Sequence, residues 1–141
     1  MTTRFVVDTG PLVAFLNRRD RFHDWAIKEL ARVEPPLHTC EAVLSEACFL
    51  LQRGAGDADP LMDMLDRDLI AVEFRVADEH GRVRKLMRRY QDQGMSLADA
   101  CLVRMTELAS DCTLLTLDAD FGIYRRNGRQ VIPVRMPQKT T

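Results

Sequence analysis

The chain lacks several features that identify whole classes of protein. No apolar stretch approaches the ~20 residues that a bilayer-spanning helix needs. The first apolar run stops at Asp8 and follows no group of several positive charges, so it is not typical of a signal peptide. No repeat, low-complexity run or domain boundary is present. We expect a single cytosolic domain over residues 1–141, with a core at about 4–134 and a short C-terminal tail.

Cysteine and histidine are both scarce, and their spacing is not that of a zinc site. The four cysteines form no CxxC pair, and the three histidines are not spaced as ligand pairs with them. Three of the cysteines stand in apolar surroundings. We therefore expect reduced thiols that behave as small buried hydrophobes at Cys40, Cys48, Cys101 and Cys112.

Bulk positive charge is also missing, because the net charge is −1. This excludes a polycation that coats nucleic acid through its whole surface. Lysine is rare, and arginine forms local clusters at Arg18–Arg21, at Arg82–Arg89 and at Arg125–Arg129. Each cluster is either a solvated face or a local phosphate-binding surface, for which arginine is well suited.

Apolar runs typical of strands alternate with segments of helical periodicity. We predict strands at 4–8, 37–39, 69–74, 112–116 and 131–134. We predict helices at 9–16, 23–33, 41–53, 78–90 and 97–109, another that begins at Asp57 or Asp59, and a helical turn at 118–124. Thr9 and Ser96 are the expected N-caps of the first and last helices. This alternation predicts an α/β fold with a mostly parallel sheet of four to five strands, covered on both faces.

Four acidic residues lie beside core-forming runs. Asp8 and Asp118 each follow a predicted strand, whereas Glu46 and Asp99 lie within apolar helical runs. An ionised carboxylate in such surroundings is costly unless something positive compensates it. The functional crevice of a parallel sheet lies at the carboxyl ends of its strands, where Asp8 and Asp118 fall. A shared divalent cation is the simplest compensator.

Each of these acids also has a purely structural explanation. Asp8 could cap a helix, Asp99 could form a capping box with Ser96, and Asp118 could start a turn. Glu46 could lie on the solvent side of its helix. Any one of these explanations is sound, but all four holding together is improbable.

The four acids in this order resemble the PIN-domain family. The segments that carry the resemblance are 6–16 (VVDTGPLVAFL), 43–47 (VLSEA), 95–100 (MSLADA) and 115–121 (LTLDADF), and the likeness covers about residues 4–134. The strongest likeness is to the VapC-type toxin ribonucleases of bacterial VapBC toxin–antitoxin pairs. The resemblance implies a three-layer α/β/α PIN-like domain.

It also implies a divalent-metal-dependent endoribonuclease that hydrolyses phosphodiester bonds in single-stranded RNA. Oxygen ligands without Cys or His suit Mg²⁺ or Mn²⁺. By this likeness Asp8 and Asp99 are the main metal ligands, Glu46 completes the site directly or through water, and Asp118 holds a second ion or orients the attacking water. Thr9 and Thr116 are supporting hydrogen-bonding residues, and Asp120 is a reserve acid.

Partners follow from the same resemblance. A cognate antitoxin protein and a homodimeric state are implied, together with an RNA substrate held by phosphate contacts. The candidate RNA-binding residues are Arg18, Arg19, Arg21, Arg82 and Arg88; position 85 is Lys85 and receives no such role.

The sequence lacks the motifs of two other classes of protein with a similar sheet. The run Asp8-Thr9-Gly10 lacks the second acid of haloacid-dehalogenase-like phosphatases, and no lysine follows a late strand as in a response-regulator receiver. A PIN-like module that binds RNA or protein without turnover remains an alternative. So does a housekeeping RNA-processing nuclease.

Overall fold

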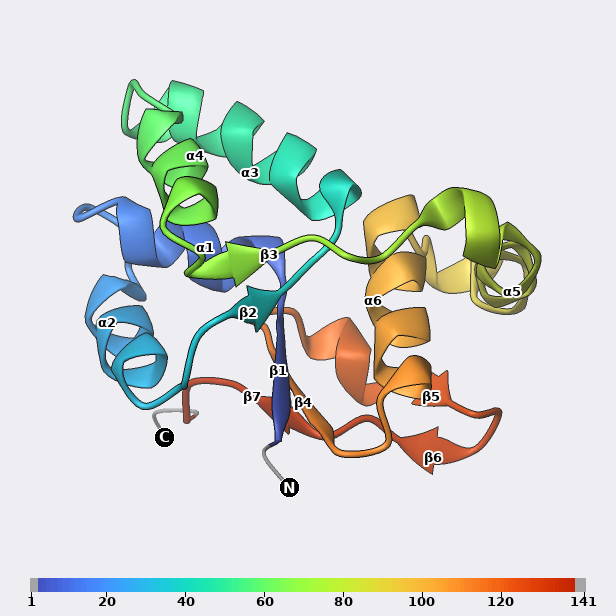
Figure 1. Cartoon of the computed structure of the whole chain (residues 1–141). Coiled ribbons are helices and arrows are strands. Elements are labelled where there is room, and N and C mark those ends of the chain that lie inside the picture. Colours follow the sequence, from blue (N-terminus) through green and yellow to red (C-terminus); the bar gives the residue numbers. More distant parts are fainter. Residues whose placement is uncertain (1–2, 139–141) are drawn as a thin grey trace.

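A computed structural model gives the fold of residues 3–138, with helices on both sides of one central sheet (Figure 1). The sheet has the order β3-β2-β1-β4-β7, and each neighbouring pair of strands is parallel. The predicted mostly parallel sheet is therefore confirmed. Its strands are β1 (Arg4–Val7), β2 (Leu37–His38), β3 (Ile70–Ala71), β4 (Cys112–Leu115) and β7 (Val134–Arg135).

The helices form two layers around this sheet, as the α/β/α prediction required. Figure 1 shows α1, α2 and α4 on one side and α5 and α6 on the other, while α3 packs on α1 and also contacts α6. Within the described residues, no helix combines the length and apolarity needed to cross a membrane. The helices are α1 (Thr9–Leu16), α2 (His23–Ala31), α3 (Glu41–Gly54), α4 (Asp59–Asp66), α5 (Val76–Arg89) and α6 (Leu97–Leu108). Shorter elements are η1 (Gln91–Gln93), η2 (Ala119–Gly122), β5 (Arg125–Arg126) and β6 (Gln130–Val131).

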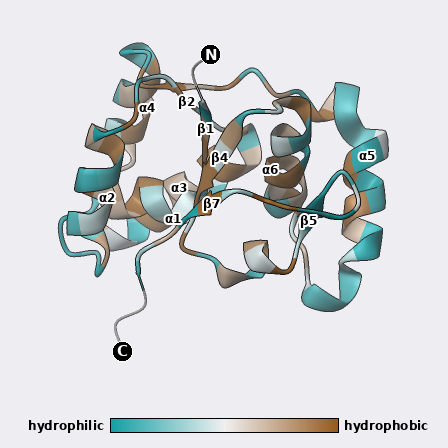
Figure 2. Ribbon diagram, turned by 90° about the horizontal axis from the view of Figure 1, so that it is seen from below, coloured by the Kyte–Doolittle hydropathy of each residue, from teal (hydrophilic) through white to brown (hydrophobic). Residues whose placement is uncertain are grey.

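The centre of the core is the pairing of β1 with β4. Val6, Val7, Leu114 and Leu115 are completely buried there, with Val7 opposite Leu115. Strands covered on both faces read as continuous apolar runs in the sequence, which is why both strands could be predicted. Figure 2 shows hydrophobic residues along these strands and hydrophilic residues on the outer helix faces. Burying each such side chain contributes about 1.5–3 kcal/mol to folding.

The last predicted strand, 131–134, is wrong. Val131 pairs with Arg125 in the antiparallel hairpin β5–β6, whereas Val134 pairs with Leu114 in the main sheet. The chain reverses at Asn127 and Gly128, whose φ angles of 52° and 84° lie in the left-handed region. An Asn-Gly pair favours such turns, so the sequence did contain a hairpin signal.

Other predicted boundaries shift by a few residues. The strand predicted at 69–74 shortens to Ile70–Ala71, and α5 starts at Val76 rather than at residue 78. The expected cap Thr9 is instead the first residue of α1, and Asp8 is the cap. Ala58 occupies the cap position of α4, although the Asp57 side chain accepts a hydrogen bond from the backbone N–H of Asp59 at 2.9 Å.

The four cysteines are free thiols. Cys40, Cys101 and Cys112 are buried, and Cys48 is half-buried. The predicted burial is confirmed for three of the four. They contribute to the core as small hydrophobic side chains.

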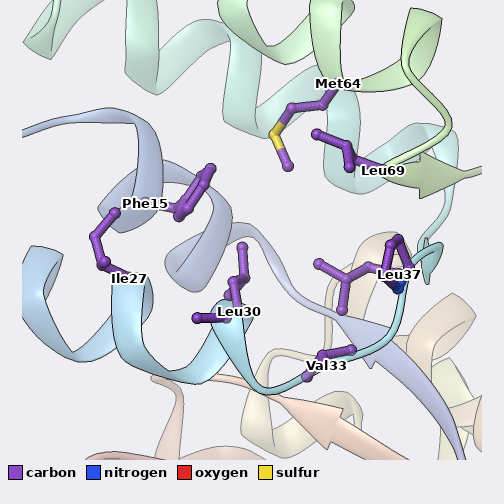
Figure 3. A pocket seen from close by; sticks show the side chains of 9 residues that line it. Phe15, Ile27, Leu30, Val33, Leu37, Met64 and Leu69 are labelled. Atoms are coloured by element: carbon purple, nitrogen blue, oxygen red, sulfur yellow. The ribbon is translucent and has the colours of Figure 1, made fainter.

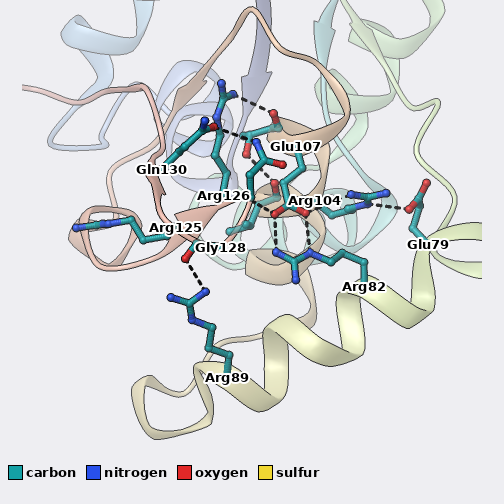
Figure 4. Close-up of polar contacts among 12 residues, drawn as sticks. Glu79, Arg82, Arg89, Arg104, Glu107, Arg125, Arg126, Gly128 and Gln130 are labelled. Carbon is teal, nitrogen blue, oxygen red and sulfur yellow. Dashed lines mark hydrogen bonds and ion pairs between the residues drawn. The ribbon is translucent and has the colours of Figure 1, made fainter.

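An ion-pair network joins α5 to α6 (Figure 4). Arg82 donates two hydrogen bonds to Glu107, at 2.9 and 2.6 Å, while Arg104 bonds both Glu79 and Glu107. The backbone N–H of Asn127 donates to Glu107 at 2.7 Å, and the Glu107 side chain is 1% exposed. Burial acts to raise the pKa of Glu107, but the hydrogen bonds from Arg82 and Asn127 outweigh it and hold the pKa below its ordinary value.

We predict that Glu107→Gln lowers the free energy of unfolding by about 2–3 kcal/mol at pH 7, because two partly buried guanidinium groups lose their counter-charge. Since folding depresses the pKa of Glu107, this contribution is complete above its unfolded value of 4.5 and is lost as the pH falls through the folded value. Urea unfolding at pH 7 and pH 3 measures both effects.

The exposed Glu34→Gln is the matched control for this substitution, and it should change the free energy of unfolding by less than about 0.5 kcal/mol. Equal stability of Glu107→Gln and wild type at pH 7 would show that the network does not stabilise the fold.

Candidate acidic site

Asp8 is held at the point where β1 becomes α1. Its backbone N–H bonds the carbonyl of Leu115 at 2.9 Å, which extends the β1–β4 ladder by one residue. Its carboxylate caps α1 by accepting from the N–H of Thr9 at 2.7 Å, and it also accepts from the hydroxyl of Thr116 at 2.7 Å. The residue is only 8% exposed. Asp8 is therefore a carboxylate fixed inside the C-terminal edge of the sheet.

Burial raises the pKa of Asp8 from 3.8 to about 6. The hydrogen bonds from Thr116 and Thr9 act in the opposite direction, and the nearby charges of Asp99 and Asp118 raise the pKa further. At neutral pH the ionised form is therefore held at a cost in folding free energy.

Asp99 lies in the first turn of α6 and belongs to the predicted capping box. Its N–H donates to Ser96 Oγ at 3.0 Å, and the N–H of Ser96 donates back to Asp99 Oδ2 at 3.4 Å. The hydroxyl of Tyr124 donates to the same oxygen at 3.1 Å. Burial raises the pKa of Asp99, with a further contribution from the charge of Asp118, while the Ser96 and Tyr124 hydrogen bonds oppose the rise.

Asp118 follows β4 and caps η2. Its Oδ1 accepts from the N–H of Asp120 at 2.9 Å, and its own N–H donates to Thr116 Oγ1 at 3.0 Å. Its charge raises the pKa values of both Asp8 and Asp99. Asp8, Asp99 and Asp118 thus form one electrostatic group, which we call the acidic site.

Glu46 and Asp120 lie at the margin of this site. Glu46 is exposed on α3, and its Oε2 accepts from the hydroxyl of Thr9 at 3.2 Å. Asp120 is half-buried, and its charge acts on the hydroxyl of Tyr124. Thr9 and Thr116 both make hydrogen bonds to carboxylates, as was proposed for them from the sequence.

Tyr124 is the site residue that sequence reasoning missed. Its ring is fully buried and packs edge-on against Phe121 and Tyr90, with centroid distances of 5.2 and 5.0 Å. Burial raises the pKa of its hydroxyl, and the charge of Asp99 adds to the rise. The tyrosine stays a hydrogen-bond donor and orients Asp99. The available signal in the sequence was the position of this tyrosine, four residues after Asp120.

Gly10 allows α1 to approach the end of β4. A Cβ at this position would lie 3.0 Å from Cδ1 of Leu117, which is tighter than nine in ten real Cβ contacts. A larger residue would require the Leu117 side chain or the first turn of α1 to shift by a few tenths of an ångström. The DTG sequence is therefore explained by packing as well as by chemistry.

The structure separates the candidate RNA-binding arginines. Arg18, Arg19 and Arg21 are exposed in the loop after α1, about 12 Å along that helix from its Asp8 end. Arg82 is engaged by Glu107, which leaves it a weak candidate for phosphate binding. Arg88 is exposed on α5.

The ligand chemistry of these acids suits a hard divalent cation. Carboxylate oxygens are the ligands that Mg²⁺ and Mn²⁺ prefer, and three mutually repelling carboxylates gain from a shared positive charge. Within residues 3–138, no three His, Cys, Asp or Glu side chains form a ready metal-binding group. Asp8, Asp99 and Asp118 instead accept hydrogen bonds from backbone N–H groups and hydroxyls.

A separate apolar cavity of about 280 Å³ lies among α1, α2 and α4 (Figure 3). Phe15, Ile27 and Leu30 line one part of it, and Met64 and Leu69 face them. None of the candidate acids lines this cavity. It is therefore distinct from the acidic site.

Two comparisons found known proteins that resemble this chain. A PIN domain family model matches residues 5–127. The structure is similar to that of VapC20 from Mycobacterium tuberculosis, described as a sarcin–ricin loop cleaving toxin. The TM-score is 0.74 at 25% sequence identity, over 84% of this chain and 93% of the VapC20 chain. No curated protein sequence matches the chain.

We predict that Asp8→Asn stabilises the metal-free protein at pH 7.5 by about 2–3 kcal/mol, because an amide is not destabilised by desolvation of a charge. Folding raises the pKa of Asp8, so wild-type stability should fall as the pH rises from 3.8 to about 6. The advantage of the variant should disappear near pH 4. Urea unfolding in EDTA across this range measures it.

Asp92→Asn, at an exposed position of η1, is the control with the same chemical change. If Asp8→Asn were less stable than wild type at pH 7.5, the ionised carboxylate would be stabilising and the burial argument would fail.

Proposed function

Because the chain belongs to the PIN domain family, we propose that it is a divalent-metal-dependent endoribonuclease that hydrolyses phosphodiester bonds in single-stranded RNA. The observation that carries this proposal is the meeting of Asp8, Asp99 and Asp118 at the C-terminal edge of the parallel sheet. This edge is where such sheets place their functional crevice. The likeness to VapC20, described as a sarcin–ricin loop cleaving toxin, supports RNA as the substrate class.

Each acidic residue would have its own role in metal binding or in orienting water. Asp8 and Asp99 would hold Mg²⁺ or Mn²⁺, with Glu46 completing the site directly or through water. When bound, the ion would lower the pKa of a water molecule and neutralise charge on the scissile phosphate. Asp118 would hold a second ion or orient the attacking water.

Two hydroxyls would position these acids. Thr116 contacts both Asp8 and the backbone of Asp118, so it fixes two of the acids relative to each other. Tyr124, which lies 25 residues after Asp99, fixes the Asp99 carboxylate through a hydrogen bond from its hydroxyl. Hydrogen bonds of this kind behind metal ligands commonly control metal affinity.

We also infer that the protein is the toxin of a toxin–antitoxin pair, opposed by a small antitoxin protein and acting as a homodimer. The support is the similarity to VapC20, which extends over most of both chains. One observation favours a second candidate, a PIN domain that binds RNA without turnover: the carboxylates of the described residues are not arranged as a ready metal-binding group.

We predict that the protein cleaves a labelled single-stranded RNA in Mn²⁺ or Mg²⁺ and not in EDTA. Asp8→Asn and Asp99→Asn should each reduce the rate more than about 100-fold, because each removes a charged ligand. Gel analysis of the products measures the rates. Asp92→Asn should retain the wild-type rate within about twofold. Cleavage that persists in EDTA, or that survives in both site variants, would contradict the proposal.

We predict that Tyr124→Phe weakens Mn²⁺ binding about 10-fold, because Asp99 loses the hydroxyl that orients it. Calorimetric titration with Mn²⁺ measures the affinity. Tyr90→Phe is a matched control, since its ring packs against Tyr124 and its hydroxyl only accepts the N–H of Arg125. Equal Mn²⁺ affinities of the two variants would show that the Tyr124 hydroxyl does not act through Asp99.

A further inference from the structure

A groove of about 500 Å³ runs along α5 and ends at the start of α6. Its lining includes the apolar residues Val76, Met87 and Leu97 and the basic residues His80, Arg84 and Arg88. None of the residues that line it, all within the described part of the chain, is acidic. The groove therefore combines apolar surface with basic side chains.

Two residues of the apolar lining are exposed to solvent. Val76 is 37% exposed and Leu97 is 43% exposed, and each is the first residue of its helix. Exposed apolar side chains that gather in a hollow beside charged residues mark a binding surface more often than isolated ones do. The core does not require Leu97 at this position.

The arginines of the groove are free for a ligand. Neighbouring arginines are engaged: Arg75 pairs with Asp78, Arg82 with Glu107, and Arg89 donates to the carbonyl of Gly128. Within residues 3–138, neither Arg84 nor Arg88 has a hydrogen-bond or ion-pair partner. Both side chains are exposed.

The basic residues form a row. His80, Arg84 and Arg88 are spaced four residues apart, so they lie on one face of α5 along about 12 Å of helix. A row of this length suits an extended chain with repeated negative charges. Arginine adds planar, bidentate hydrogen bonding to phosphate.

The groove and the acidic site both involve the first turn of α6. Leu97 is the first residue of α6 and lines the groove, and Asp99 lies two residues later on a different face of the helix. Figure 1 shows that the start of α6 lies next to α5 at the edge of the sheet where β1 ends. An RNA strand in the groove would therefore reach Asp99 by passing over the start of α6.

We propose that this groove binds the single-stranded RNA that flanks the cleaved phosphate, with phosphates on Arg84 and Arg88 and a nucleobase against Leu97 and Met87. The proposal rests on the function proposed above and names its substrate subsite. Alternating anionic phosphates and flat bases match the basic and apolar side chains that line the groove. An acidic, leucine-rich segment of a partner protein is the competing occupant.

The test measures binding without cleavage. Every protein carries Asp8→Asn, and a fluorescent 12-residue oligouridylate is titrated at several salt concentrations. The variants are Arg84→Gln with Arg88→Gln, Leu97→Gln alone, and a control that combines Arg32→Gln with Arg67→Gln. The control removes the same charge at exposed arginines outside the groove. Thermal melting confirms that each variant is folded.

We expect the Arg84/Arg88 double variant to bind more than 10-fold more weakly and to lose about 1.4 from the slope of log K against log salt, since each phosphate contact contributes about 0.7 on single strands. Leu97→Gln should weaken binding about threefold without changing the slope. The control should change affinity less than twofold.

Equal losses in the groove variant and the control would overturn the proposal, as would no loss in either. A second titration uses a glutamate- and leucine-rich peptide; if the groove variant loses this peptide but keeps the oligouridylate, the occupant is a protein segment and the RNA proposal is wrong. This titration measures RNA binding to proteins that carry Asp8→Asn, whereas the cleavage assay measures ribonuclease activity. Failure of the groove to bind RNA is therefore distinguished from failure of the proposed function.

Discussion

The buried carboxylate of Asp8 is the interaction on which the rest of the site depends. The β1–β4 pairing brings Asp8 against Thr116, and Thr116 in turn holds the backbone of Asp118. Burial makes the ionised form of Asp8 costly, and two more carboxylates raise that cost. The fold therefore concentrates negative charge at one edge of the sheet. A group with opposite charge would relieve it, as is common at sites where stability is lost for function.

Structural and functional roles coincide in these acids rather than excluding each other. Asp8 caps α1, Asp99 closes the capping box of α6, and Asp118 caps η2. Helix N-termini carry partial positive charge, which offsets part of the repulsion among carboxylates placed there. The capping hydrogen bonds also fix the side chains in position. The same contacts that start the helices thus gather the acids at one place.

The sequence was sufficient for the two central strands of the sheet, because β1 and β4 are buried on both faces and read as plain apolar runs. It was also sufficient for the order of the acids and for the Ser96 cap. It could not separate Arg82, paired with Glu107, from Arg88, because pairing across 25 residues depends on how α5 packs on α6. Tyr124 was missed because a tyrosine in a turn carries no periodic signal. The Asn127–Gly128 hairpin was missed because an apolar run, 131–134, outweighed a turn signal that was present.

The central claim is that the acidic site is completed by a divalent cation. The most direct measurement is anomalous X-ray scattering from crystals grown with Mn²⁺. We predict a manganese peak bounded by the carboxylates of Asp8, Asp99 and Asp118, with the hydrogen bonds of Thr116 and Tyr124 retained behind them. A manganese peak elsewhere, or none while all three acids keep their capping hydrogen bonds, would contradict the claim.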